Sequence, residues 1–188
     1  DERTAIRIFT ELQRRGRTAA AHWRESFEKA NGLTMEYTYL LTRGSRLRDV
    51  LESQVQRRVA EGRNAELAIL ELVTTAHAWG AAVPLDALQR AGLTRAEIRL
   101  ALPTLRDEHL IRGDGVLLTG LHQLRSTMLS RAVHDYPPPV IAKTAATLIA
   151  VLPPESIPAI MTGALRDDPT LLEPVFAALA ERLRSEPT

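Results

Sequence analysis

The sequence predicts a mainly α-helical protein in which one short β-hairpin interrupts the helices. Apolar residues recur at helical spacing along most of the chain, and only one pair of strand candidates flanks an Asp-Gly turn. Of the 188 residues, 45% are apolar and 25% charged, as in folded globular domains. We expect three parts: a helical bundle at residues 1–62, helices with the hairpin at 63–135, and a helical segment at 136–188.

The first part reads as four helical stretches. Apolar positions predict a helix from Arg3 to Arg17, and a second helix should run from Thr18 to Asn31. The stretch Leu33 to Thr42 is apolar and aromatic on almost every side, and a charged helix follows as far as Gly62. Together these segments form a small bundle.

The second part has three helices in a particular order. Asn64 can cap a helix that ends near Trp79, and Pro84, as a first helical residue, opens a short helix. Thr94 and Glu97 have the spacing of a capping box at the start of a third helix. A long helix, a short helix and a long helix are therefore expected before the strands.

Two short strands should follow the third helix. The candidates are His109–Arg112 and Val116–Leu118, and Gly113-Asp114-Gly115 between them suits a tight turn because Asp-Gly tolerates positive φ. Three helices followed by a two-stranded wing are the element order of a winged helix. We therefore predict a winged-helix domain at 63–135.

The third part begins where the composition changes at Pro137-Pro138-Pro139. Beyond it, Val140–Leu152, Glu155–Arg166 and Pro169–Arg184 have helical patterns, each introduced by Pro. Turns of about four residues or fewer are typical of consecutive antiparallel helices. The segment 136–188 resembles the start of a helical-repeat array.

Composition excludes several classes of function. Twenty-four Lys and Arg against 23 Asp and Glu give a net charge of +1, which does not favour a generic polyanion binder. Without Cys, disulfides, thiol nucleophiles and zinc-thiolate sites are excluded. The longest apolar run, Ala142–Leu152, is too short to span a membrane, so no membrane partner and a cytoplasmic location are expected.

Catalytic motifs are missing from the sequence. It contains no phosphate-binding loop of the GxxxxGK[ST] type, no GxGxxG, no HExxH and no GxSxG. We therefore expect no catalytic residue, no metal ligand and no enzyme activity in this chain alone. Because the chain starts at Asp1 without Met or a signal peptide, we expect it to be part of a longer protein.

A winged helix also raises the alternative of a DNA-binding transcriptional regulator. In that alternative, the helix from Thr94 to Glu108 would enter the major groove, and the proline-led helices would dimerise. The candidate DNA contacts are Arg95, Arg99, Arg106 and, on the wing, Arg112. Three acidic residues leave the helix neutral, whereas phosphate neutralisation supplies much of the affinity of such proteins, so nucleic acid is not the favoured partner.

His122 is the candidate binding residue at the junction between the second strand and the following helix. An imidazole at this corner can donate a hydrogen bond to a diphosphate oxygen, and the helix N-terminus adds positive potential. The alternative is a buried histidine that is bonded to a backbone carbonyl. The sequence pattern alone favours the buried histidine.

Three segments resemble the region that follows the nucleotide-binding core in STAND-class signalling NTPases, which include NACHT proteins and plant resistance proteins. Gly32–Thr42 resembles the close of the helical lid, Leu67–Leu118 resembles the winged helix, and Leu121–Leu124 lies where the family has its Met-His-Asp motif. Leu121 replaces the Met and Gln123 replaces the Asp.

The resemblance implies a regulatory role. The motif's histidine, here His122, would contact the β-phosphate of bound ADP and hold the winged helix against the core in a closed, inactive state. Residues 1–62 would be a lid remnant, and the helices of 136–188 would couple a sensed ligand to opening. A shift of this kind requires nucleotide or ligand to bind the two states with different affinity.

The same resemblance implies which partners the chain has. ATP or ADP with Mg would be bound by the full-length parent, and no cofactor is expected in this chain itself. The expected partners are the nucleotide-binding core and the effector domains of the parent, and a homo-oligomer is a further expectation.

Overall fold

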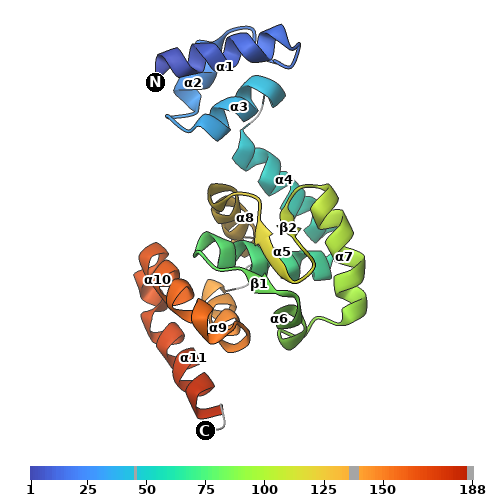
Figure 1. Ribbon diagram of the computed structural model, residues 1–188, viewed down its shortest axis with the longest axis vertical. Coiled ribbons are helices and arrows are strands. Elements are labelled where there is room, and N and C mark those ends of the chain that lie inside the picture. Colours follow the sequence, from blue (N-terminus) through green and yellow to red (C-terminus); the bar gives the residue numbers. More distant parts are fainter. Residues whose placement is uncertain (45, 136–139, 186–188) are drawn as a thin grey trace. The chain divides into compact units, whose positions relative to one another are not determined.

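The computed structural model describes residues 1–44, 46–135 and 140–185 and is mainly helical, with a small antiparallel sheet (Figure 1). This confirms the predicted predominance of helix. The predicted change at Pro137–Pro139 lies outside the described residues. The chain divides into two compact units, Asp1–Gln54 and Val55–Thr188. We describe each unit by itself.

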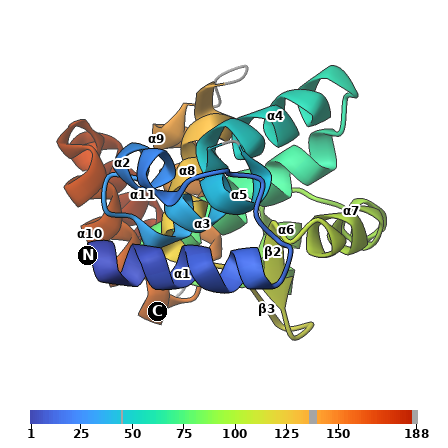
Figure 2. The same ribbon diagram turned by 90° about the horizontal axis from the view of Figure 1, so that it is seen from above.

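Unit 1 contains three helices and the start of a fourth: α1 (Glu2–Arg14), α2 (Trp23–Lys29), α3 (Thr34–Arg43) and the first half of α4 (Leu47–Ala60). The Asp1 carboxylate caps α1 by accepting a hydrogen bond from the Thr4 N–H at 2.8 Å. Helix α1 packs against α2 and α3 (Figure 2). The buried Glu36 carboxylate accepts from the Leu47 N–H at 3.1 Å and so satisfies a donor in the first turn of α4.

Helix α2 is shorter than predicted, because it begins at Trp23 rather than Thr18. The Leu41 carbonyl at the end of α3 accepts hydrogen bonds from the Ala19 N–H at 2.6 Å and the Thr18 hydroxyl at 3.1 Å. These bonds tie the segment before Trp23 to another helix. A contact this distant in sequence outweighs the local helical pattern.

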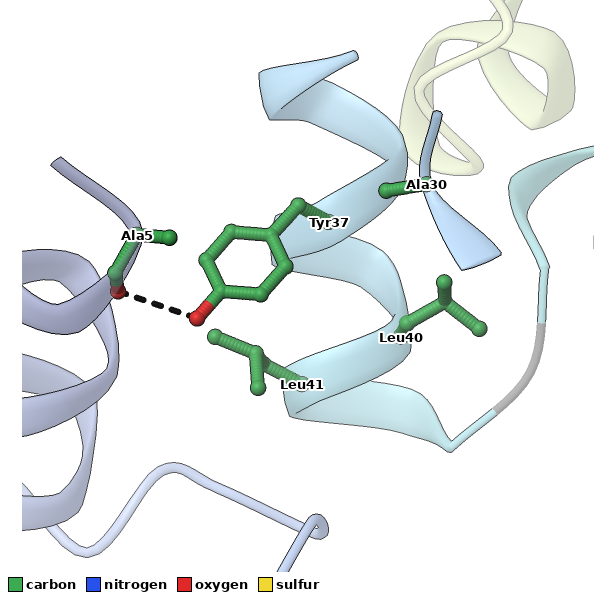
Figure 3. Close-up of a cluster of buried hydrophobic side chains, with 5 residues drawn as sticks. All are labelled: Ala5, Ala30, Tyr37, Leu40 and Leu41. Carbon is green, nitrogen blue, oxygen red and sulfur yellow. Dashed lines mark hydrogen bonds between the residues drawn. The ribbon is translucent and has the colours of Figure 1, made fainter. Parts of the chain in front are cut away.

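The core of unit 1 is a cluster around Tyr37 (Figure 3). The Tyr37 hydroxyl donates to the Ala5 carbonyl of α1 at 2.9 Å, and burial raises the pKa of the Tyr37 hydroxyl. Phe27 of α2 meets the Tyr37 ring edge-on, with the centroids 5.9 Å apart. One aromatic side chain thereby links three helices.

Unit 2 holds the rest of the chain. Its elements after α4 are α5 (Asn64–Ala78), β1 (Val83–Pro84), α6 (Leu85–Arg90), α7 (Arg95–Asp107), β2 (Ile111–Gly113), β3 (Leu117–Gly120), α8 (Gln123–Asp135), α9 (Ile141–Val151), the 3-10 turns η1 (Pro154–Ser156) and η2 (Pro169–Leu171), α10 (Ile157–Asp167) and α11 (Leu172–Ser185). The sheet is antiparallel with the order β1-β3-β2.

The predicted hairpin is confirmed, and its turn is closed by a side chain. The Asp114 carboxylate accepts from the N–H groups of Val116 and Leu117, both at 3.0 Å, and these bonds lower the pKa of Asp114. Gly115 has a φ of +100°. The strands themselves lie slightly later than predicted, because β2 starts at Ile111.

Two predictions about helix starts are wrong and one is confirmed. Pro84 is not the first helical residue. It belongs to β1, where it pairs with Leu117 of β3, and it directly precedes α6. The strand β1 was therefore not predicted. Asn64 lies within α5, whose start has no side-chain cap. Thr94 and Glu97 form the predicted capping box of α7.

Helix α5 is the centre of unit 2. The five consecutive residues 72–76 are all buried, which leaves no side of this part of the helix exposed to solvent. Helices α7, α8 and α9 and the strands all contact α5. Over 1–44, 46–135 and 140–185, no helix combines the length and the apolar character that crossing a bilayer requires.

The three predicted helices after residue 139 are confirmed, and α9 and α11 lie side by side (Figure 1). Trp79, at the end of α5, is buried against α10. A Cβ at Gly163 would lie 2.4 Å from the Trp79 Cβ, so only glycine permits this approach. The Trp79 indole N–H donates to the Asp167 carboxylate at 3.0 Å.

Two arginines satisfy the carbonyls at the C-terminal end of α9. Arg90 of α6 donates to the Val151 carbonyl at 2.8 Å. Arg182 of α11 donates to the carbonyls of Ile149 at 2.6 Å and Leu152 at 2.5 Å. These groups have no partner within their own helix, and cations also suit the negative end of the helix dipole.

A buried arginine joins α4 to α5 and to the end of α7. The Arg58 side chain is 0% exposed and contacts Glu66 at 2.9 Å and Glu108 at 2.7 Å. Burial would raise the pKa of Glu108, but the hydrogen bond from Arg58 and the charges of Arg57, Arg58 and Arg63 outweigh burial and hold that pKa below its usual value.

Replacing this arginine should destabilise the chain strongly. Arg58→Met leaves the carboxylates of Glu66 and Glu108 without their buried partner, so we expect the free energy of unfolding to fall by about 3–5 kcal/mol. Urea unfolding followed by circular dichroism measures it. Arg57→Met is the control, because that half-exposed side chain should contribute at most about 1 kcal/mol. Similar losses in both variants would contradict the assignment.

Candidate functional site

The candidate site is the corner between β3 and α8, where His122 lies. Its ring is exposed, and its Nδ1 accepts a hydrogen bond from the Leu124 N–H at 3.2 Å. The structure therefore differs from the alternative of a buried histidine donating to a backbone carbonyl. The ring instead occupies a capping position at the start of α8.

The bond to Leu124 fixes where the proton of the neutral imidazole resides. Because Nδ1 accepts, Nε2 carries the hydrogen and is a donor. Within the described part of the chain, no group accepts a hydrogen bond from Nε2 of His122. The corner thus presents one unused N–H donor to solvent at the positive end of a helix.

Gln123 holds the corner against α5. Its side-chain Nε2 donates to the Ala78 carbonyl, near the C-terminal end of α5, at 2.9 Å. A carboxylate at this position could not donate. The amide therefore performs a positioning task here that an Asp could not perform.

A pair formed by the buried Ser126 and the half-buried His77 lies next to the corner. His77 Nδ1 and Ser126 Oγ are 2.8 Å apart. Burial first, and then the charges of Arg112 and His122, lower the pKa of His77. Ser126 is 1% exposed, which keeps its hydroxyl away from any reagent in solution. The pairing joins residues 49 positions apart, and no sequence signal indicated it.

Arg112 of β2 pairs with Thr119 of β3, three residues before His122, so this hairpin residue lies near the corner. Arg112 is exposed, and its Nε donates across the hairpin to the Thr119 hydroxyl at 3.3 Å. The corner therefore combines a cationic side chain, an imidazole donor and a helix N-terminus. Each of these features favours an anion.

The other arginines proposed as DNA contacts divide into two groups. Arg95 and Arg99 are exposed on α7 and line a pocket of about 500 Å³ between α6, α7 and the hairpin turn. Arg106 is half-buried, and its charge helps to lower the pKa of Asp114. Asp86, Leu85 and Val116 also line the pocket, so its wall is mixed rather than basic.

In the described ranges, no three His, Asp or Glu side chains come together in a group that could hold a metal ion.

The chain was compared with protein-family models, with curated proteins and with solved structures. No family model, no curated protein and no solved structure matches it.

Gly120 allows β3 to approach α8, and replacing it tests how the corner is built. In Gly120→Ala, the new Cβ would lie 1.9 Å from the Ser126 hydroxyl and 2.9 Å from His77 Nδ1. We expect a loss of about 1–3 kcal/mol in the free energy of unfolding. Thermal and urea unfolding measure it.

The double variant Gly120→Ala/Ser126→Ala is the matched test, with Ser126→Ala alone as the reference. Removing the hydroxyl relieves the shortest contact, so the double variant should lose less than the sum of the single losses. Strict additivity would show that the strand does not depend on this close approach.

Proposed function

We propose that this chain is the regulatory module of a STAND-type ATPase, in which residues 63–135 form a winged helix that packs on a nucleotide-binding core. Three helices precede the hairpin, and β1, between α5 and α6, pairs with β3 to give the order β1-β3-β2. This arrangement supports the winged-helix assignment. The choice of family rests on the three sequence segments that resemble STAND-class NTPases.

His122 carries the proposal. Its ring is exposed at the N-terminus of α8, with Nδ1 occupied by the Leu124 N–H and Nε2 free to donate. A phosphate oxygen is the acceptor that such a donor suits, and the charge of Arg112, which pairs with Thr119 in the adjacent strand, adds attraction. In the proposed closed state, His122 donates to the β-phosphate of ADP held by the core.

The nucleotide state would then control the position of the winged helix. ADP, contacted by His122, favours the closed arrangement, and exchange for ATP with Mg in the core weakens that contact. The coupling equals the difference in nucleotide affinity between the two arrangements. Helices α9, α10 and α11 are proposed as the start of a helical-repeat sensor, with the effector domains elsewhere in the parent.

In the family's Met-His-Asp motif an Asp follows the histidine, whereas Gln123 occupies this position here. The bond from Gln123 to the Ala78 carbonyl supports a corner that differs from the family pattern. In place of a carboxylate that forms a salt bridge, the amide ties the corner to α5. The proposed consequence is that orientation of His122 relies on α5 rather than on an ion pair.

His122→Ala in the full-length protein tests this function. Loss of a hydrogen bond to a charged phosphate is worth about 1.5–3 kcal/mol, so ADP should dissociate roughly 10- to 100-fold faster. Release of a fluorescent ADP analogue in stopped flow measures it. His22→Ala, also at an exposed histidine, is the control and should leave the rate unchanged. An unchanged rate in His122→Ala would remove the proposed role.

DNA binding is a second candidate, because Arg95 and Arg99 are exposed together beside the hairpin turn. Asp86 lines the same pocket, and the neighbouring Leu100 and Val116 are 76% and 68% exposed, which suits a protein partner better than phosphate. We therefore place this function second.

Duplex DNA provides the direct test of that candidate. With a fluorescent random duplex, we expect no anisotropy change even at low salt, because residues 94–108 carry as many acidic as basic side chains. Binding with a steep log-log salt slope that Arg95→Ala/Arg99→Ala abolishes would overturn this ranking and favour a transcriptional regulator.

A further inference from the structure

Helix α11 carries two lines of side chains at helical spacing, and among the residues that the structure describes only one of these lines is covered. Leu171, just before α11, and Val175 are buried, and with Ala178 and Arg182 they follow the spacing four, three, four along the side that packs on α9. A second set, Leu172, Phe176, Leu179 and Leu183, has the same spacing one residue later. We call this second set the outer seam.

The outer seam is exposed to solvent. Leu172 is 55% exposed, Phe176 49% and Leu183 65%, and Leu179 is half-buried. The four residues lie on one side of the helix, because spacings of four and three alternate about the helical period. Alternating spacings of four and three are the pattern by which helices pair in coiled coils.

We propose that the outer seam binds the outer seam of a second copy of this chain, with the two α11 helices antiparallel. The spacing four, three, four reads the same in both directions. In the antiparallel register, Leu172 lies opposite Leu183 of the second copy, and Phe176 lies opposite Leu179. All four layers are then apolar.

Charge favours the antiparallel direction. Glu173 lies in the first turn of α11 and Arg184 lies in the last turn. Arg182 also lies in the last turn, but its guanidinium donates to the carbonyls at the end of α9. Antiparallel pairing brings the acidic end of one helix to the basic end of the other and opposes the two helix dipoles. Parallel pairing would bring Glu173 next to its own copy. The proposal uses no contact of His122 and is independent of the nucleotide role.

Single-cysteine variants can read the direction, because the natural sequence has no Cys. Leu172→Cys and Leu183→Cys proteins, one carrying a mass tag, are mixed and mildly oxidised. The antiparallel register places these two positions in one layer, while two Leu172 residues would be separated by about 16 Å along the axis, beyond disulfide reach. We expect the mixed disulfide to exceed each homodimeric product by about tenfold.

Sedimentation velocity of the 188-residue chain provides the second measurement, from about 10 µM to about 1 mM, since an interface of this size should be weak. The natural chain should shift toward dimer as the concentration rises, and Phe176→Asp should abolish the shift. Leu100→Asp, at an exposed leucine of α7, is the control and should dimerise normally. Circular dichroism verifies that each variant is folded.

Three results would overturn the proposal. A chain that stays monomeric and forms no mixed disulfide would show that the outer seam does not bind a second copy. Predominant Leu172–Leu172 disulfides would indicate parallel pairing. Dimerisation that survives Phe176→Asp but is lost in Leu100→Asp would place the interface on α7.

Discussion

The burial of residues 72–76 on every side of α5 is the constraint on which the rest of unit 2 depends. A helical segment without a solvent-facing side requires its polar side chains to find partners within the protein. The Thr74 hydroxyl donates to the Leu70 carbonyl, and the hydroxyl oxygens of Thr75 and of Ser130 in α8 are 2.7 Å apart. Glu71 accepts from Thr144 of α9. These bonds fix α8 and α9 around α5 in one arrangement, with Arg58 and Glu66 closing the N-terminal end.

Local patterns predicted what depends on neighbouring residues. The helical periods, the Asp-Gly turn, the capping box of Thr94 and the three proline-led helices needed nothing from elsewhere in the chain. Contacts from distant positions decided the rest. The two-residue strand β1 exists because β3 lies beside it, and the segment after Thr18 is not helical because Leu41 accepts its donors. Likewise, nothing near Arg58 in the sequence indicates that Glu108 neutralises it 50 positions later.

The corner at His122 was likewise predictable from local sequence only in part. The sequence could place a histidine between strand and helix, but exposure of the ring depends on how α8 packs on α5. The position of its proton follows from a single backbone bond to Leu124. The Gln123 bond to Ala78 could not be predicted either, since its acceptor is 45 positions away. Residue type thus identified the position, and tertiary packing determined which atom faces outward.

The absence of a side chain at Gly163 has a mechanical consequence. With the α10 backbone against Trp79 and the indole bonded to Asp167, the two helices cannot slide past each other without displacing a large ring. Arg90 and Arg182 add a second attachment at the end of α9. A torque applied to α9, α10 and α11 would therefore be transmitted to α5 with little relative movement, because these helices are attached to α5 rigidly rather than through a hinge.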